Sequence, residues 1–439
     1  MMKTKILQHM LTIAFVTGGV MTHAAPATDG AQSKPKFTMI DSSFYSEHIR
    51  SVASVTEVFG DGQRLTTVIV QYDAPIQNKA LDKQTFRVDG RSILRVYAND
   101  HAQKAQTGKD GQFVVIELDP SDSNAATYNP QGPILSQAAV TVSQVIPIKT
   151  VAGQKYAATT KPISNSQQIN LVVDDFQQLQ FKDPITGLTL NYNLYLPKED
   201  GQHKKYPAVL FMHDLGVTNM NPYTTLVQGL GATVWASPES QAKHPAFVIA
   251  PQYPVALAND SSQTSVYADI TVRLLEDLQK RYPIDSDRLY TTGQSGGCMT
   301  SIALNIAHPN LFAASLFVAG QWDATKVAPI AKNKLWIVVS QDDNKAYPGM
   351  NAITETLEKN GAKVTRAVWD GTSSAAQFQK DVKTIEKAGP NSNVYYVAFK
   401  KGTVIPAGQS TQGAAGHRNT WRIAYTIDGI RDWLFEQHK

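Results

Sequence analysis

Two hydrophobic patterns divide the chain of 439 residues. From about residue 37 to residue 171, short runs rich in β-branched residues alternate with turn dipeptides such as Asp61-Gly62 and Asp110-Gly111. The clearest of these runs cover residues 65–72, 113–118 and 140–146. Short strands at this spacing, without a long amphipathic helix, are typical of a sandwich of two sheets. We therefore expect a small all-β sandwich domain over residues 37–171.

From residue 172 to residue 439 the pattern changes. A predicted hairpin over 179–195 is followed by apolar runs that alternate with stretches of helical periodicity, the clearest of which are 270–282 and 421–437. The apolar runs are 208–212, 246–249, 289–291, 315–318, 335–339 and 394–397. Continuously apolar strands between helices indicate a mostly parallel sheet covered on both faces. The second domain, residues 172–439, is thus expected to be of the α/β class.

The N-terminus has the layout of a secretory signal peptide. Lys3 and Lys5 precede a mostly apolar run over 10–21, and small residues, including Ala24 and Ala25, follow it. This run is too short for a membrane span, which needs roughly 20 apolar residues. We expect residues 1–25 to be removed on export to the periplasm or the extracellular space, and residues 26–36 to form a flexible leader.

Composition and charge exclude several classes of protein. Hydrophobic residues make up 42% of the chain and charged residues 18%, which is an ordinary globular balance. The net charge of +4 falls to about +2 once Lys3 and Lys5 are removed, too little to indicate nucleic acid as a partner. Cys298 is the single cysteine, so an internal disulfide and a Cys-rich metal site are excluded. We expect no cofactor, no metal and no membrane span, and the oligomeric state stays open.

The sharpest chemical signal is the segment Gly293-Gln294-Ser295-Gly296-Gly297. It lies between a predicted strand ending near residue 292 and a predicted helix over 298–307. A G-x-S-x-G motif in that setting is the nucleophile elbow of α/β hydrolases, because the tight turn leaves no room for bulky neighbours. Ser295 is therefore the candidate nucleophile.

A serine hydroxyl needs a base to accept its proton, and in this fold the order along the chain is serine, acid, histidine. His308, His417 and His438 follow Ser295. His308 directly follows a predicted helix and His438 is the penultimate residue, which favours structural or frayed positions for them. His417 lies in a glycine-rich loop before the last predicted helix, and we expect it to be the base.

The acid should follow the strand that ends at residue 339. Asp343 and Asp342 both fit that position; we favour Asp343 and keep Asp342 as the alternative. Asp323 and Asp370, in other loops, are lesser candidates.

The developing oxyanion needs backbone donors. The N–H of Gly296 is one, and the N–H of Leu215, or else of Asp214, is expected to be the other. We expect His213 to support this loop. Cys298 is expected to pack as a small apolar side chain. Aromatic candidates for the substrate pocket are Trp322, Tyr347 and Trp421.

Several further segments resemble secreted bacterial esterases that carry an N-terminal immunoglobulin-like domain, relatives of polyhydroxybutyrate-depolymerase-like and feruloyl esterases and, more distantly, of prolyl-oligopeptidase-type domains. These segments are 194–197, 235–254, 287–290, 346–350 and 430–435, together with His417 and Trp421. The resemblance implies Ser295 as nucleophile, Asp343 as acid and His417 as base. The chain departs from it in two places: Gly296 stands where methionine is frequent, and His213-Asp214 where His-Gly is usual.

The sequence therefore predicts a serine carboxylic-ester hydrolase that acts through an acyl-enzyme on a small-molecule or polymer ester. Two alternatives stay open: a serine peptidase of the prolyl-oligopeptidase type with the same three residues, and a non-catalytic binding protein on a hydrolase fold. Acyl and alcohol specificity, and the role of the β-sandwich domain, are not determined by these patterns.

Overall fold

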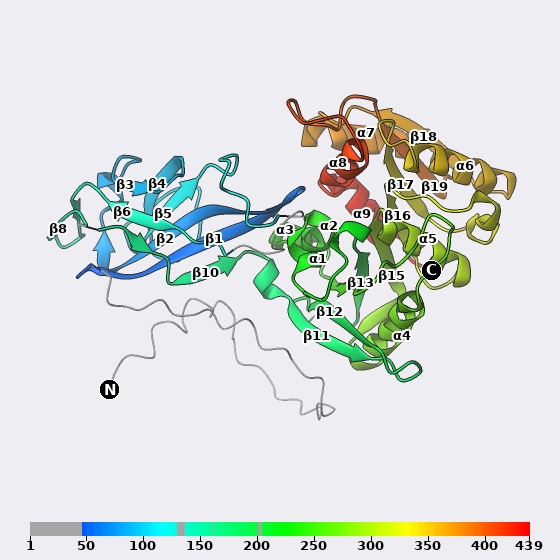
Figure 1. Ribbon diagram of the computed structural model, residues 1–439, viewed down its shortest axis with the longest axis horizontal. Coiled ribbons are helices and arrows are strands. Elements are labelled where there is room, and N and C mark those ends of the chain that lie inside the picture. The colour runs from blue at the N-terminus through cyan, green and yellow to red at the C-terminus, as the bar shows by residue number, and fades with distance from the viewer. Residues whose placement is uncertain (1–45, 130–136, 160, 200, 202–203) are drawn as a thin grey trace.

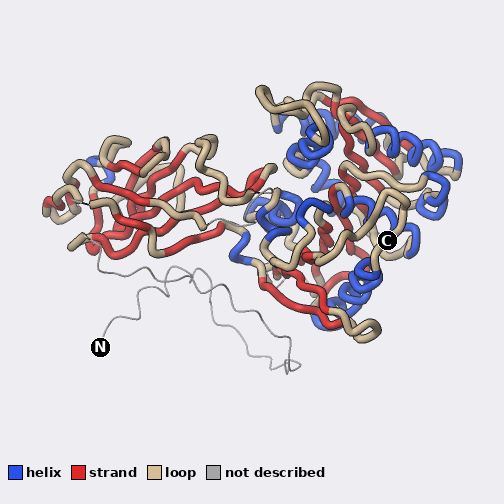
Figure 2. Tube along the Cα trace, viewed as in Figure 1, coloured by secondary structure: helices blue, strands red, loops and turns tan. Residues whose placement is uncertain are grey.

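The computed structural model describes residues 46–129, 137–159, 161–199, 201 and 204–439. The expected signal peptide and leader, residues 1–36, lie outside the described residues. Figure 1 shows a β-rich body formed by the N-terminal part of the chain, beside a larger body in which helices surround a sheet. Figure 2 shows that nearly all the helices belong to this second body.

The N-terminal domain is built on a five-stranded sheet with the order β10-β1-β2-β5-β4. Its strands are β1 (Ile49–Phe59), β2 (Gly62–Ile76), β4 (Ile93–Asn99), β5 (Gly111–Leu118) and β10 (Gln167–Asn170). Shorter strands complete the domain: β3 (Phe86–Val88), β6 (Thr141–Gln144), β7 (Ile148–Lys149), β8 (Lys155–Tyr156) and β9 (Ile163–Ser164). One apolar cluster joins the five-stranded sheet to the shorter strands, with Val70, Ile116, Val142 and Ile163 among its buried members. The three sequence runs rich in β-branched residues all form strands here.

The second domain contains a nine-stranded sheet with the order β11-β12-β14-β13-β15-β16-β17-β19-β18. The strands are β11 (Gln177–Lys182), β12 (Thr189–Tyr195), β13 (Tyr206–Met212), β14 (Phe247–Gln252), β15 (Ile284–Gln294), β16 (Ala314–Val318), β17 (Leu335–Ser340), β18 (Val364–Trp369) and β19 (Val394–Phe399). The pairs β11–β12 and β12–β14 are antiparallel, and the remaining pairs are parallel. The predicted α/β-hydrolase fold with a preceding β domain is confirmed.

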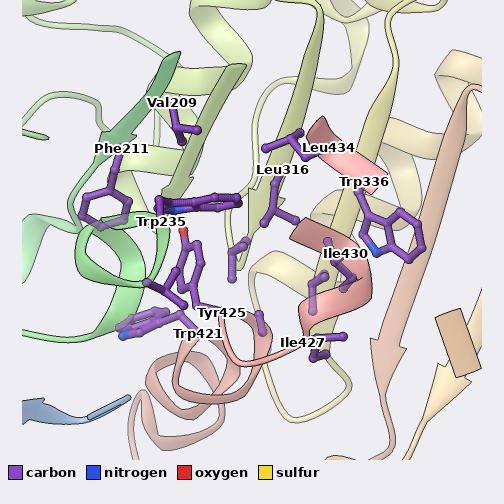
Figure 3. Packing of buried hydrophobic residues seen from close by; sticks show 14 of the residues in the cluster. Val209, Phe211, Trp235, Leu316, Trp336, Trp421, Tyr425, Ile427, Ile430 and Leu434 are labelled. Carbon is purple, nitrogen blue, oxygen red and sulfur yellow. The ribbon is translucent and has the colours of Figure 1, made fainter. Parts of the chain in front are cut away.

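Helices cover both faces of this sheet. The α-helices are α1 (Thr224–Val227), α2 (Leu230–Thr233), α3 (Pro238–Lys243), α4 (Val266–Arg281), α5 (Gly296–Ala307), α6 (Ala346–Lys359), α7 (Ala375–Ala388), α8 (Ala415–Ala424) and α9 (Asp428–Glu436). Along β17, Trp336 belongs to one apolar cluster and its neighbour Ile337 to another. Figure 3 shows Trp336 beside Ile430 and Leu434 of α9. Strands buried on both faces explain the continuous apolar runs in the sequence.

The prediction of one final helix over 421–437 is wrong, because the segment forms parts of α8 and α9 with a break between them. At the break, the buried Ile427 has an extended backbone, and the Thr426 hydroxyl donates to the carbonyl of Ile423. Apolar periodicity continues across the break because both helices bury one face. His417 accordingly lies inside α8, and not in the loop before it.

The sequence patterns also missed β18, which lies at one edge of the sheet. Its residues are mostly part-exposed, so they do not form a continuous apolar run. Among the described residues, no helix has the length and apolar character needed to cross a membrane.

Candidate active site

The nucleophile elbow joins β15 to α5. Ser295 has φ 51° and ψ −119°, an unusual conformation for a residue with a side chain. A Cβ added to Gly297 would lie 1.9 Å from the carbonyl oxygen of Met212, and one added to Gly293 would lie 2.5 Å from the carbonyl carbon of Gly297. Only glycine fits at both positions, so the spacing of the motif follows from the packing of the turn.

Three side chains from separate elements meet at this turn. The Nε2 atom of His417, in the first turn of α8, lies 2.8 Å from the Oγ atom of Ser295. Its Nδ1 atom forms a hydrogen bond with Oδ2 of Asp343, in the loop after β17. This contact assigns the imidazole tautomer: Nδ1–H donates to the carboxylate, and Nε2 can accept the serine proton.

The environment of Asp343 keeps its carboxylate charged. Its side chain is only 3% exposed, and burial by itself raises the pKa. The hydrogen bond from His417 and the backbone N–H groups of Ala346 and Lys345 outweigh that effect, so the net pKa is lowered. Its second oxygen, Oδ1, accepts from these N–H groups at 2.9 and 3.1 Å. The start of α6 thus holds the carboxylate that faces the imidazole.

Of the two aspartates left open by the sequence, Asp343 contacts His417. Asp342 instead accepts a hydrogen bond from the N–H of Gly402. Asp323 and Asp370 bond to nearby threonines within their own loops, at Thr325 and Thr372.

The other candidate histidines lie elsewhere. His308 is exposed at the C-terminal end of α5, and His438 is exposed near the C-terminus, where its carbonyl accepts from Lys334.

Both expected oxyanion donors lie at the first position of a helical turn. Gly296 begins α5, and Leu215 begins the 3-10 turn η5 (Leu215–Val217). The N–H groups at such positions have no partner within their own helix. The side chain of Leu215 packs directly over Gly296, where an added Cβ would lie 2.4 Å from Leu215 Cδ2. The glycine that departs from the usual methionine therefore makes room for Leu215.

His213 supports the Leu215 loop through the hydrogen bonds of its buried ring. It is buried, its Nε2 accepts from the N–H of Tyr253 at 3.0 Å, and its Nδ1 lies 2.7 Å from the carbonyl oxygen of Asp214. Burial lowers its pKa, which favours the neutral ring that this pattern requires.

A pocket of about 420 Å³ opens above these groups. It is lined by Leu215, Asp260, Ser295, Met299, Gln321, Asp342, Asp343, Asn344, Lys345, Gly413, Ala414 and His417. The expectation that Trp322, Tyr347 and Trp421 line it is wrong. Trp322 and Tyr347 are partly buried and pack against the apolar cluster that contains Ile337 and Met350, and Trp421 is buried with its ring edge-on to that of His417.

Sequence reasoning missed the mouth of this pocket. The carboxylate of Asp260 accepts from Lys345 Nζ at 2.6 Å and from Gln321 Nε2 at 3.1 Å, so it links three loops. These residues are far apart in the chain and belong to no motif, so no local signal could have revealed them. In the described part of the chain, no group of histidine, cysteine and acidic residues is arranged to hold a metal ion.

Cys298 lies in the first turn of α5, directly after the nucleophile elbow. It is fully buried, and burial raises the pKa of its thiol, so the thiol stays protonated. This confirms that it packs as a small apolar side chain.

Comparison with known proteins agrees with this fold. Residues 51–157 match the family described as the esterase Ig-like N-terminal domain, and residues 185–414 match the putative esterase family. The chain belongs to the putative esterase family. This esterase is a serine hydrolase that acts on carboxylic esters.

Several solved structures are similar to this chain. The crystal structure of a thermostable esterase is 27% identical, with 89% of this chain and 100% of that chain covered and a TM-score of 0.76. The CE1 ferulic acid esterase of Anaeromyces mucronatus is 12% identical, with coverage of 58% and 91% and a TM-score of 0.35. The serine hydrolase FphF of Staphylococcus aureus is 13% identical, with coverage of 59% and 98% and a TM-score of 0.33. A search of curated proteins gave no match.

Proposed function

We propose that this esterase hydrolyses its substrate through an acyl-enzyme on Ser295, with His417 as general base and acid and Asp343 as the carboxylate that orients it. The observation that carries the proposal is the continuous hydrogen-bonded series from Ser295 Oγ through the His417 ring to Asp343. Esterase family membership favours this activity over the peptidase and binding-protein alternatives.

In the acylation step, Ser295 Oγ attacks the ester carbonyl carbon while its proton passes to His417 Nε2. The tetrahedral intermediate then collapses. Its bond to the alcohol oxygen breaks, and His417 returns the proton to that oxygen. The alcohol leaves, and the acyl group remains as an ester of Ser295. Asp343 stabilises the imidazolium that exists between these two proton transfers.

In the deacylation step, His417 Nε2 removes a proton from water, whose oxygen attacks the acyl carbon. The second intermediate collapses with release of the carboxylic acid, and the proton on His417 returns to Ser295 Oγ. The net reaction converts the ester and one water molecule into the carboxylic acid and the alcohol, and no further co-reactant takes part.

The N–H groups of Gly296 and Leu215 are proposed to bind the negatively charged oxygen of both intermediates. Donors of this kind act mainly on the transition state, and removing one typically costs about 3 kcal/mol of its stabilisation. Leu215 also brings an apolar side chain to the pocket, beside Met299. We propose that these two residues contact the acyl or alcohol chain.

Hydrolysis of nitrophenyl esters, from acetyl to long acyl chains, tests the proposal. We expect Ser295→Ala to retain less than about one thousandth of the wild-type kcat, since the nucleophile is lost. Comparable rates for Ser295→Ala and wild type would refute the assignment. A peptide library assayed in parallel checks the peptidase alternative, for which we expect no cleavage.

We also propose that the protein is exported, with cleavage near Ala24 or Ala25. The support is the basic start, the apolar run over 10–21 and the small residues that follow. The mass of the protein recovered from the periplasm or medium of an expressing bacterium tests this. A mass that still includes residues 1–25 would contradict it.

A further inference from the structure

The hairpin between β1 and β2 reaches from the N-terminal domain into the hydrolase domain. Residues 59–62 form its tip, where Phe59 pairs with Gly62. Figure 1 shows this blue hairpin ending between the green helices near α2 and the red helix α8. In Figure 3 the blue strand ends close to the helix that carries Trp421.

The contact between the hairpin tip and α8 is a close approach of two backbones. A Cβ placed on Gly60 would lie 2.4 Å from the carbonyl oxygen of Arg422 and 2.7 Å from its Cγ. On the other side, a Cβ on Gly229, which precedes α2, would lie 3.2 Å from the carbonyl oxygen of Gly60. The tip is therefore wedged between two helices, at distances that allow no side chain at position 60.

Arg422 is held rigidly in this contact. Its Nε donates to Asn419 at 3.0 Å and its Nη2 to the carbonyl of Val404 at 2.9 Å. Burial lowers the pKa of its guanidinium, and the charge of Asp61 at the hairpin tip partly offsets that effect. The hairpin thus brings a close steric contact to the last turn of α8, while the Asp61 carboxylate, which pairs with Arg64 at 2.6 Å, adds negative charge near Arg422.

A second contact joins the domains beside the hairpin. Tyr128 packs against Gly62, where an added Cβ would lie 2.8 Å from Tyr128 Cδ1. Its ring is 9% exposed and belongs to the same apolar cluster as Phe211 and Trp421 of the hydrolase domain. Burial and the nearby charge of Asp214 both raise the pKa of its hydroxyl.

The position of α8 matters because His417 lies in its first turn. The chain that leads into this helix, residues 406–414, is exposed throughout, and a side-chain hydrogen bond between it and α8 runs from Asn419 Nδ2 to Gln409 Oε1 at 3.0 Å, so it buries little of the helix. What holds α8 is the set of contacts along its length, and the hairpin supplies one of them at its C-terminal end. A shift of about 1 Å in a catalytic group can cost a hundredfold in rate.

We propose that the hairpin tip, residues 59–62, is a positioning element for the catalytic base: it holds α8 and thereby the distance between His417 and Ser295. This inference rests on the proposed role of His417. It gives the immunoglobulin-like domain a part in catalysis that needs no contact with substrate.

The variant that tests this is Gly60→Asn, whose Cβ must displace the Arg422 backbone. A matched control is Gly153→Asn in the same domain. Gly153 has φ +86°, which asparagine tolerates, and no atom lies within 4 Å of its added Cβ. We expect Gly60→Asn to lower kcat at least tenfold with KM within twofold, and Gly153→Asn to match wild type. If the hairpin tip had only a structural role, Gly60→Asn would lower the amount of folded enzyme, and kcat per active site would stay at the wild-type value.

Titration of active sites with a fluorophosphonate normalises both variants to folded enzyme. A folded Gly60→Asn enzyme with kcat within twofold of the control would overturn the proposal. If Gly60→Asn does not fold, the milder variant Asp61→Ala decides, because Asp61 is exposed. A threefold or greater loss of its kcat supports the proposal, and an unchanged kcat overturns it. Ser295→Ala, assayed in parallel, reports separately on the proposed function, since residual hydrolysis there would count against the mechanism and not against the hairpin.

Discussion

Asp214 is the residue at which this chain departs most clearly from the esterases it resembles, and its contacts explain what it does. Its Oδ1 accepts from the N–H of Gly216 at 2.8 Å, which caps the turn that begins at Leu215. Its Oδ2 accepts from Nε2 of Gln294, the residue before the nucleophile, at 3.0 Å. One carboxylate therefore fixes the loop of one proposed oxyanion donor relative to the elbow that supplies the other.

Replacing this carboxylate should weaken catalysis without weakening substrate binding. For Asp214→Ala we expect kcat to fall by about tenfold to a hundredfold, since the Leu215 N–H loses its fixed direction, while KM stays within twofold. Asp214→Asn is the control, because its amide oxygen can still cap the turn, and it should retain more activity. Steady-state kinetics on a nitrophenyl ester provide the measurement. An Asp214→Ala enzyme as fast as wild type would show that the loop needs no such support.

At the scale of elements, the antiparallel hairpin β11–β12 is fastened to α4 by an ion pair. The Asp183 carboxylate is fully buried and accepts from Arg273 Nε at 2.5 Å and from Nη2 at 3.0 Å. The hydrogen bond from Arg273 is the main cause of a strongly lowered pKa of Asp183, and bonds from Thr186 add to it. The pair connects the first two strands of the sheet to a helix that follows β14.

Removing that charge should destabilise the protein in a pH-dependent way. For Asp183→Asn we expect unfolding to cost about 3 kcal/mol less near neutral pH, because Arg273 keeps a partly buried, unpaired charge. A lowered pKa in the folded state means that the stabilisation exists above the ordinary carboxyl pKa of about 4 and is lost as the pH falls below it.

Urea unfolding near neutral pH and again near pH 3 measures this difference. The difference in free energy of unfolding between wild type and Asp183→Asn should be smaller near pH 3 than near neutral pH. An equal difference at both pH values would mean that the ion pair is not the source of the stabilisation. Lys182→Gln, an exposed change next to it, serves as control.

Elements whose signal is local could be predicted from the sequence, and others could not. The buried strands β13 and β17 have continuous apolar runs, and the G-x-S-x-G turn has its steric requirement for glycine, so both were found. The break between α8 and α9 was missed, because packing keeps the apolar period across it. The pocket mouth at Asp260 was missed as well, since its ion pair with Lys345 depends on how distant loops meet.

At the scale of the whole molecule, the two domains share buried surface. Tyr128 and, at the end of β1, Val58 join the apolar cluster on one face of the hydrolase sheet. Sequence patterns indicated two domains but gave no sign of this shared cluster, because a residue that packs between domains looks like any other buried aromatic. The arrangement makes the β domain a structural part of the enzyme.

Truncating Tyr128 should therefore destabilise the hydrolase domain as well as its own. For Tyr128→Ala we expect a loss of about 3 kcal/mol of stability, typical of removing a buried aromatic ring. Tyr128→Phe, which keeps the ring, should stay close to wild type. Thermal unfolding followed by calorimetry and by loss of esterase activity gives the measurement. If Tyr128→Ala loses its esterase activity on heating at the same temperature as wild type, the domains are not coupled through this ring.

The central claim is that Ser295 carries the acyl group during turnover. Mass spectrometry of the enzyme quenched in acid during hydrolysis of a nitrophenyl ester tests it most directly, with peptide mapping to locate the adduct. We expect the mass of one acyl group on the peptide that contains Ser295, and its absence from His417→Ala, which cannot activate the serine. An acyl adduct on another residue would contradict the account. So would steady ester hydrolysis by wild type or Asp343→Asn when the quenched samples of that enzyme never contain an acylated peptide.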